Sequence, residues 1–163
     1  MPGIKISMPM ICGLDVAGEI AEIGANVSGW KIGERVLIDP RNRVEGGLVG
    51  ETIHGGLAEY CRVKEHQLVR IPDGVSFDQA SSLPVAYGTA HRMMMTIGQV
   101  TSDDKILILG ASGGVGTGAL LLAKMAGAEV VVCASSDSKM EKLRSLGACL
   151  LYTSDAADET VRV

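Results

Sequence analysis

The stretch Lys105-Ile-Leu-Ile-Leu-Gly-Ala-Ser-Gly-Gly-Val-Gly116 joins a continuous apolar run to a cluster of glycines. Small and apolar residues then recur at helical spacing from Val115 to Ala126. This combination is typical of a buried parallel strand, a tight turn and a helix. A second apolar run, Glu129-Val-Val-Val-Cys133, follows at the spacing of a βαβ unit. We therefore predict that an α/β domain with a parallel sheet opens over these residues.

The turn of this unit carries a Gly-x-Gly-x-x-Gly fingerprint in which Ala111 takes the place of the first glycine. Gly113 would let the backbone approach a pyrophosphate, and Gly116 would let the helix pack closely on the strand. The N–H groups at the helix start would then face the phosphates. Thr117 stands where a P-loop needs lysine, so we predict a dinucleotide site, with a purely structural turn as the alternative. The predicted cofactor-binding residues of the turn are Gly110, Ala111, Ser112, Gly113, Gly114, Val115 and Gly116.

The composition is that of an ordinary globular chain. Its 163 residues suffice for one domain or two small ones, and 47% of them are hydrophobic. We find no apolar run of membrane-spanning length and no secretory signal. The net charge of −4 argues against a nucleic-acid surface. The cysteines form no Cys-x-x-Cys pair, so we expect free, buried thiols in a reducing, cytoplasmic compartment at Cys12, Cys61, Cys133 and Cys149.

Residues 1 to about 72 have a β-rich pattern, and the period changes to a helical one after the turn signal Pro72-Asp-Gly74. The strands that we predict are Gly18–Gly24, Trp30–Ile38 with a bend at Gly33, Leu57–Val63 and Leu68–Ile71, with a loop over residues 39–56. A capping box at Ser76 and Gln79 predicts the start of a helix. An apolar helix is predicted over Ala86–Met95, with Met93–Met95 as core filler and an end at Gly98. A second capping box at Ser138 and Glu141 predicts another helix, with Gly147 as its C-terminal cap.

This order of strands, junction helices and β-α-β-α resembles the medium-chain dehydrogenase/reductase superfamily, in its zinc-free branch of quinone oxidoreductase-like and alcohol dehydrogenase-like enzymes. The stretches that carry the resemblance are Pro9–Gly18, Gly33–Val36, Gly55–Tyr60, Ile71–Gly74, Leu83–Ala90 and Gly110–Gly116. The resemblance implies a partial GroES-like catalytic domain with junction helices over residues 1–97. It also implies the first β-α-β-α of a Rossmann domain over residues 98–148, so the fold class is α/β with a β-rich part.

The chain departs from the zinc-binding members of this family at the ligand positions. Leu14 stands where those members have a histidine ligand, and Val85 stands where they have a cysteine ligand. Neither side chain offers the N, S or O donor that zinc needs. The segment Arg41–Gly50, in the place of the structural zinc lobe, contains no cysteine. The resemblance therefore implies an enzyme without zinc.

The end of the second predicted strand indicates the choice of cofactor. NAD-specific Rossmann domains place a carboxylate there to bind the ribose 2′-hydroxyl. This chain has Ala134 at that position, followed by Ser135 and Ser136, with Lys139 a turn later. Hydroxyls and a lysine can accept a 2′-phosphate, so we predict NADP(H) over NAD(H), with Ser135, Ser136 and Lys139 as cofactor-binding residues. Asp137 weakens this inference, and the two serines could serve only the loop and the helix cap.

The resemblance implies hydride transfer between NADP(H) and a small-molecule quinone, enone or other activated carbonyl, with hydrogen-bond donors in place of zinc. Thr89 matches the junction-helix threonine near the nicotinamide, although it could instead bond to the preceding turn. Asp15 takes the place of the zinc enzymes' glutamate, with either an active-site or a structural role. The alternatives are an NAD(P)-dependent alcohol dehydrogenase-like enzyme and a nucleotide-binding relative without catalysis. We expect a homo-oligomer that binds neither nucleic acid nor membrane.

The family extends beyond the matching stretch on both sides, so we expect this chain to be a fragment without activity. The run Cys149–Glu159 resembles the translation of a transposase sequencing adapter. We therefore expect residues 149–163 to be foreign to the family. The alternative is a third strand of the parallel sheet at Leu150–Tyr152.

Overall fold

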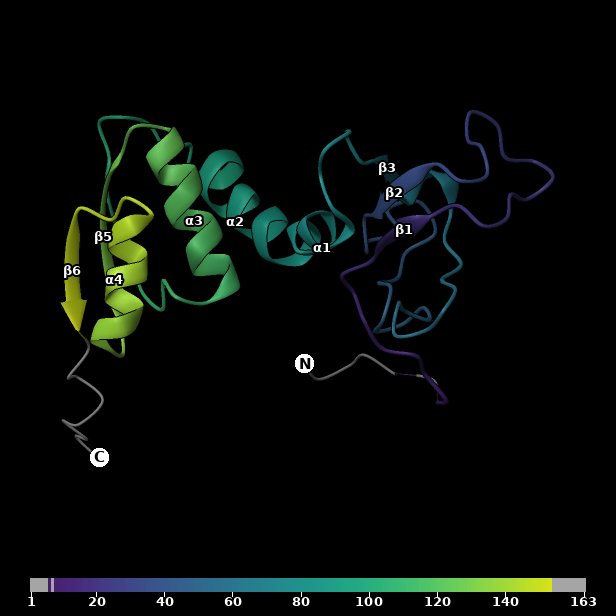
Figure 1. Cartoon of the computed structure of the whole chain (residues 1–163), viewed down its shortest axis with the longest axis horizontal. Helices are drawn as coiled ribbons and strands as arrows, with labels where there is room; N and C mark the ends of the chain where they lie inside the picture. The colour runs from purple at the N-terminus through teal and green to yellow at the C-terminus, as the bar shows by residue number, and fades with distance from the viewer. Residues whose placement is uncertain (1–5, 7, 154–163) are drawn as a thin grey trace. The chain divides into compact units, whose positions relative to one another are not determined.

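The structure, a computed structural model, describes residues 6 and 8–153, and the backbone alone for residues 150–153. It divides into two compact units, Met1–Val85 and Ala86–Val163, each of which we describe by itself. In Figure 1 the strands β1, β2 and β3 mark the first unit, and the second unit contains β5, β6, α3 and α4. The mixed α/β architecture agrees with the predicted fold class.

The first unit holds an antiparallel sheet in the order β1-β2-β3 (Figure 1). Its strands are β1 (Ala17–Glu19), β2 (Arg35–Ile38) and β3 (Leu68–Arg70). The short 3-10 helix η1 (Glu65–Gln67) directly precedes β3. Leu37 of β2 pairs with Ala17 and with Val69, which sets the register of all three strands. Gly33 has a φ of 84°, so the predicted bend before β2 is confirmed. The strands β1 and β2 are shorter than the strands that we predicted there, Gly18–Gly24 and Trp30–Ile38.

The predicted strand Leu57–Val63 is wrong, because this segment has no neighbouring strand among the described residues. The N–H groups of Gly55, Gly56 and Leu57 donate instead to the irregular segment 11–13. Two apolar side chains of the segment remain open to solvent, Leu57 at 76% and Tyr60 at 77% exposure. An alternating sequence pattern predicts which side chains of a strand could be buried. It does not show whether a second strand lies beside it to pair with its backbone N–H and C=O groups.

Four helical segments follow the sheet: α1 (Phe77–Ser81), η2 (Leu83–Tyr87), α2 (Gly88–His91) and η3 (Arg92–Ile97). The capping box at Ser76 is confirmed, because Gln79 donates its N–H to Ser76 Oγ and Ser76 donates its N–H to Gln79 Oε1. The segments η2 and η3 are π-helical, which the apolar pattern does not predict. Met94 is buried as core filler, whereas Met93 is 52% exposed.

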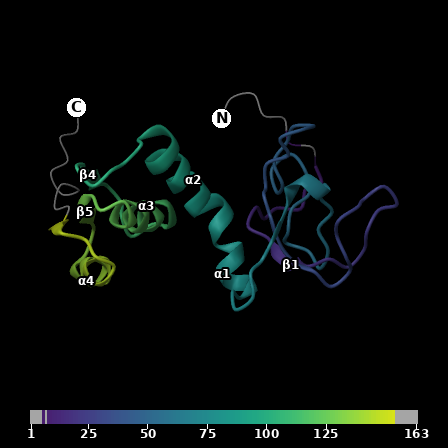
Figure 2. The same ribbon diagram turned by 90° about the horizontal axis from the view of Figure 1, so that it is seen from above.

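The second unit contains the predicted β-α-β-α order and one further strand. Its elements are β4 (Lys105–Ile108), α3 (Gly114–Met125), β5 (Glu129–Ala134), α4 (Asp137–Ser145) and β6 (Leu150–Thr153). The parallel strands pair in the order β4-β5-β6. Both helices pack on strands of this sheet, as Figure 2 shows from above. The strand β6 lies where the alternative third strand was expected. Residues 154–163 lie outside the described part of the chain. The foreign origin of residues 149–163 therefore stays a prediction.

The core of the second unit forms where α3 lies on β5. Leu120 and Ala123 of the helix and Val130 and Val132 of the strand are all fully buried. Gly118 permits the junction helix to approach α3, because a Cβ at this position would lie 3.1 Å from Ala90 Cβ. Burial of these aliphatic side chains supplies the main favourable free energy of this unit. Within the described part of the chain, no helix combines the length and the apolar character that a bilayer crossing requires.

All four cysteines are free thiols. Cys12 and Cys149 are exposed, so the expectation that the thiols are buried is wrong for these two. Cys61 is half-buried, and burial raises the pKa of its thiol. The apolar neighbours of Cys12 in the sequence do not cover it, because they lie in an irregular segment and not in a sheet.

Candidate functional site

The glycine fingerprint forms a tight turn between β4 and α3. Gly110 has a φ of 64°, and its carbonyl accepts the N–H of Gly113 at 3.0 Å. Ala111 is fully buried, and its N–H donates to the carbonyl of Cys133 in β5 at 3.2 Å. The hydroxyl of Thr117 donates to the carbonyl of Ala111 at 3.0 Å. The turn is therefore fixed to the neighbouring strand β5 and to α3. Thr117, which in the sequence only argued against a P-loop, is one of the residues that hold it.

The glycines of the turn differ in what surrounds them. A Cβ at Gly116 would lie 2.6 Å from the carbonyl oxygen of Gly110, so packing of the helix start on the turn requires glycine there. A Cβ at Gly113 would meet only that same oxygen, at 3.5 Å, and would otherwise extend into open space. Ser112, Gly113 and Gly114 are exposed. The surface beside the turn is thus open to a ligand.

The start of α3 offers hydrogen-bond donors to an anion. The first N–H groups of an α-helix have no acceptor within the helix, and the helix dipole places partial positive charge at this end. Gly113 is the N-cap residue of α3 and provides no side chain to satisfy them. The exposed turn and the helix start are therefore suited to hold a pyrophosphate, as the fingerprint predicts.

A second polar group lies where β5 ends. Ala134, the last residue of β5, is 5% exposed, and Lys139 Nζ donates to Ser135 Oγ at 3.1 Å. Ser136 has extended backbone and is the N-cap residue of α4, and its hydroxyl lies 3.3 Å from that of Ser138. The predicted capping box at Ser138 and Glu141 is therefore wrong. The helix already begins at Asp137, because the extended conformation ends at Ser136.

Both polar groups lie at the same edge of the parallel sheet. The bond from Ala111 to Cys133 holds the fingerprint turn against the last residues of β5, which lead directly to Ser135. The carboxyl ends of the strands in such sheets are the usual place for a bound dinucleotide. The structure therefore brings the predicted residues of the turn and the pair Ser135 and Lys139 to one edge, although they are separated in the sequence.

Thr89 lies on α2, in the same unit as the fingerprint. Its side chain is exposed, and its hydroxyl makes no hydrogen bond among the described residues, so the expected alternative of a bond to the preceding turn is not observed there. The segment η2, which directly precedes α2, packs against the start of α3, since a Cβ at Gly114 would lie 3.1 Å from Ala86 Cβ. Thr89 is therefore one helical turn away from a residue that lies against the fingerprint helix.

Asp15 lies in the first unit and has a structural partner. Its Oδ1 accepts the N–H of Val85 in η2 at 3.2 Å, across 70 positions of sequence. The carboxylate thus satisfies a donor in the first turn of a helical segment, where negative charge is favourable. Leu14 and Val85 are both partly buried and carry no metal-binding atom. The described residues contain no group of three or more His, Cys, Asp or Glu arranged to hold a metal ion, and zinc independence stays a prediction.

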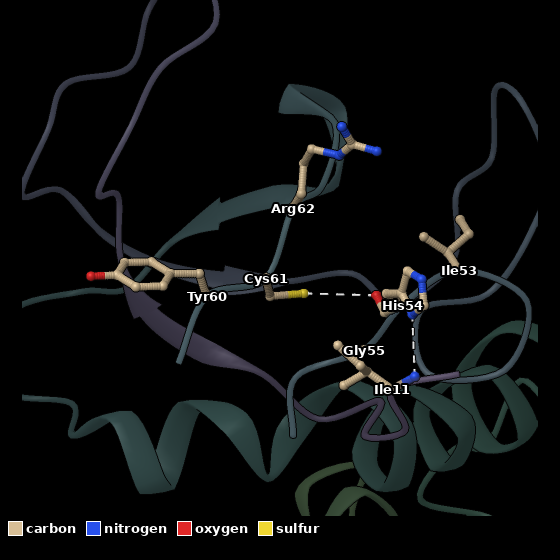
Figure 3. A pocket seen from close by; sticks show the side chains of 7 residues that line it. All are labelled: Ile11, Ile53, His54, Gly55, Tyr60, Cys61 and Arg62. Atoms are coloured by element: carbon tan, nitrogen blue, oxygen red, sulfur yellow. Dashed lines mark hydrogen bonds between the residues drawn. The ribbon is translucent and has the colours of Figure 1, made fainter. Parts of the chain in front are cut away.

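A hollow of about 250 Å³ lies elsewhere in the first unit and contains none of the predicted site residues (Figure 3). His54 accepts the N–H of Ile11 on its Nδ1 at 3.2 Å, and Cys61 Sγ lies 4.0 Å from the carbonyl of His54. Figure 3 shows Tyr60 and Arg62 extending away from these groups. The raised pKa of Cys61 keeps its thiol protonated, which argues against a nucleophilic role for this cysteine.

Comparison with known proteins identifies relatives of the whole described chain. The profile of the family described as "Alcohol dehydrogenase GroES-like domain" matches residues 2–73. The chain is 40% identical over 144 residues to 2-methylene-furan-3-one reductase of Solanum lycopersicum, covering 88% of this chain and 36% of that protein. It is 36% identical over 155 residues to the chloroplastic NADPH-dependent alkenal/one oxidoreductase of Arabidopsis thaliana, covering 93% of this chain and 39% of that protein.

Among solved structures, the crystal structure of an NAD-dependent alcohol dehydrogenase matches with a TM-score of 0.85 and 29% identity. The match covers 91% of this chain and 48% of that chain. The chain thus spans less than half the length of each of these three proteins. The similarity includes both the β-rich part and the glycine turn.

Proposed function

This chain belongs to the medium-chain dehydrogenase/reductase superfamily, and from that premise we propose that the longer protein of which it forms a part works as an NADP(H)-dependent oxidoreductase. The proposed reaction is hydride transfer to a quinone, an enone or another activated carbonyl without zinc. The observation that carries the choice of cofactor is the 3.1 Å contact between Lys139 Nζ and Ser135 Oγ. It places an ammonium group and a hydroxyl together at the strand end, next to a fixed glycine turn.

The residues present fit a bound dinucleotide. Open space around Gly113 and the unpaired N–H groups at the start of α3 would hold the pyrophosphate. Lys139 and Ser135 would donate to a 2′-phosphate, because hydrogen bonds between ionised partners are stronger than neutral ones. Ala134 provides no carboxylate to repel that phosphate. Asp137 lies in the first turn of α4 and is exposed, so water screens its negative charge.

The nicotinamide, when bound, supplies the hydride, and the chain supplies orientation and polarisation. We assign Thr89 as a hydrogen-bond donor to the carbonyl oxygen of the substrate, since its hydroxyl is exposed and makes no bond among the described residues. Asp15 has the supporting role of holding the N–H of Val85 at the start of the junction helix. With Leu14 and Val85 in place of zinc ligands, polarisation would depend on such donors.

A second candidate function is that of an NAD(P)-dependent alcohol dehydrogenase-like enzyme, which the similarity to a solved NAD-dependent alcohol dehydrogenase favours. A nucleotide-binding relative without catalysis is the third. Consumption of NADPH with a quinone or an enone supports the leading proposal, and NADPH binding without turnover of either substrate supports the third. We also propose that the protein is a homo-oligomer in the cytoplasm. The free state of all four cysteines supports a reducing compartment.

The cofactor proposal is tested by calorimetric titration of this chain with 2′,5′-ADP and with 5′-ADP. We expect tighter binding of 2′,5′-ADP, and a loss of about tenfold in its affinity on Lys139→Gln, because a charged hydrogen bond is removed. Binding of 5′-ADP should change little in that variant. The matched control is Lys142→Gln, an exposed lysine of the same helix. Equal affinities for the two ligands would show that NADP(H) is not preferred.

A further inference from the structure

We infer that the loop from Arg41 to Gly47, hereafter the arginine loop, is a second anion-binding site that takes a phosphate group carried on a small molecule. The loop belongs to the first unit and is independent of the proposed dinucleotide site. It encloses a hollow of about 340 Å³ lined by Arg41, Asn42, Arg43, Gly46 and Gly47. This volume lies at the lower end of the range of small-molecule sites.

The loop is held in shape by its own buried amide. Asn42 is only 4% exposed, and its Oδ1 accepts the N–H groups of Val44 at 3.2 Å and of Glu45 at 3.0 Å. The backbone N–H of Asn42 donates to the carbonyl of Gly47 at 3.1 Å, which closes the loop. His66 Nε2 also lies 3.0 Å from Asn42 Oδ1. A loop with this many internal bonds loses little conformational freedom when a ligand binds.

The glycines keep one side of the hollow open. Gly46 and Gly47 have φ values of 82° and 101°, a conformation that favours glycine. No heavy atom lies within 4 Å of the place that a Cβ on Gly46 would take. On the other side, a Cβ on Gly47 would lie 2.9 Å from Ile53 Cδ1, the end of a flexible side chain, so the positive φ and not packing is the reason for glycine there. The backbone at Gly46 is therefore accessible to a ligand from the hollow.

The charges around the hollow leave one cation without a partner. Asp39 accepts the backbone N–H of Arg41 on Oδ1 and the Nε–H of Arg43 on Oδ2. Glu45 pairs with Lys64 at 2.9 Å, and this contact holds the pKa of Glu45 below its usual range. In the part of the chain that the structure describes, the guanidinium of Arg41 has no carboxylate within ion-pair distance. Of the two arginines that line the hollow, Arg43 is thus paired through its Nε, and Arg41 has no ion-pair partner among the described residues.

This arrangement favours a phosphate over a carboxylate. A guanidinium offers paired N–H groups that match two oxygens of a phosphate, and Arg43 can share its remaining donors because only its Nε is used by Asp39. Both arginines line the same hollow. A single carboxylate would satisfy one guanidinium, whereas a phosphate dianion can engage both.

The test is titration of the ¹⁵N-labelled chain with inorganic phosphate and with glycerol 3-phosphate, at constant ionic strength maintained with chloride. We expect the amide signals of Gly46 and Gly47 to shift and saturate. In Arg41→Gln the apparent affinity should fall about tenfold. The control is Arg62→Gln, an exposed arginine of the same unit outside the arginine loop. We expect tighter binding of glycerol 3-phosphate than of inorganic phosphate, and equal binding would contradict a ligand that carries its phosphate on a small molecule.

The amide signals also separate this site from the fingerprint. Phosphate bound at α3 would shift Gly113 and Gly114 and would be displaced by 2′,5′-ADP, whereas binding in the arginine loop would persist. If the dinucleotide proposal fails, the measurement of phosphate binding in the arginine loop can therefore still be interpreted. The inference is overturned if the signals of Gly46 and Gly47 do not saturate with phosphate, or if Arg41→Gln and Arg62→Gln bind equally well.

Discussion

Two glycines of one turn have different physical roles, although a motif treats them alike. Gly116 is surrounded by backbone, with 2.6 Å between its missing Cβ and the carbonyl oxygen of Gly110. Gly113 borders open space and has a φ of −81°, which any residue can adopt. Packing thus explains the first glycine, whereas the second has no such packing reason and would instead leave room for the proposed ligand.

The two alanine variants should separate stability from binding. We expect Gly116→Ala to lower the free energy of unfolding by about 1–3 kcal/mol, because the turn must move to admit the methyl group. Gly113→Ala should change stability by less than about 1 kcal/mol but weaken 2′,5′-ADP binding, since its methyl group occupies the ligand's space. Denaturant unfolding and calorimetry measure the two quantities. Unimpaired binding in Gly113→Ala would contradict a phosphate site at this turn.

The raised pKa of Cys61 predicts that this thiol reacts slowly with alkylating reagents. A higher pKa means less thiolate at neutral pH, so iodoacetamide should modify Cys61 more slowly than the exposed Cys12. The rate at Cys61 should increase with pH as more of its thiol ionises, and the protection of this site should vanish in urea. Peptide mass spectrometry resolves the two sites. Equal rates at pH 7 in the folded chain would show that burial does not protect Cys61.

At the scale of elements, one carboxylate connects a loop near the start of the chain to a helical segment 70 positions later. The bond from Val85 to Asp15 satisfies a donor at the start of η2, as a helix cap does from a nearby position. The first unit has only short strands, so single bonds between its segments matter more for its stability than in a long sheet.

Removal of the Asp15 carboxylate should lower the free energy of unfolding by about as much as the loss of a helix cap does. We expect Asp15→Ala to lower the free energy of unfolding by about 1 kcal/mol and Asp15→Asn to lower it less, because the amide oxygen can still accept the bond. Asp73→Ala is the control, since that carboxylate is exposed and makes no bond among the described residues. Urea denaturation gives the values, and the same loss in the alanine and asparagine variants would rule out the cap role.

At the scale of the whole molecule, each unit has its own spectroscopic reporter. Trp30 is the single tryptophan of the chain and lies in the first unit, where the guanidinium of Arg70 stacks on its ring at 4.2 Å. The helices α3 and α4 belong to the second unit and dominate its far-ultraviolet circular dichroism. The proposed dinucleotide site lies wholly in that second unit.

A ligand of the second unit should therefore stabilise the two reporters unequally. With 2′,5′-ADP at about 100 times its Kd, linkage predicts about 2.7 kcal/mol of added stability, or a rise of about 11–22 °C in Tm for a unit of this size. We expect that rise in the circular dichroism at 222 nm and a much smaller one in Trp30 fluorescence. Coincident shifts of both signals would mean that the chain unfolds as one cooperative body.

The accuracy of the sequence prediction differed between the two halves for a physical reason. In the second half the elements are adjacent in the chain, so the order β4, α3, β5 and α4 follows from local period and glycine spacing. The start of α4 was misplaced because two serines two positions apart both resemble a cap, and only the extended backbone of Ser136 distinguishes them. In the first half the strands pair across long loops, and the pattern at Leu57–Val63 predicted a strand without a partner to complete it.

The sequence by itself determined the glycine turn, the parallel β-α-β order and the absence of ligand atoms at Leu14 and Val85, because these depend on residue identity and local spacing. The tertiary structure decided which distant groups meet. It joined Lys139 to Ser135 at the edge that holds the turn, joined Asp15 to Val85, and left Arg41 beside an open hollow. Contacts between separated side chains depend on how whole elements pack, and no local pattern contains that information.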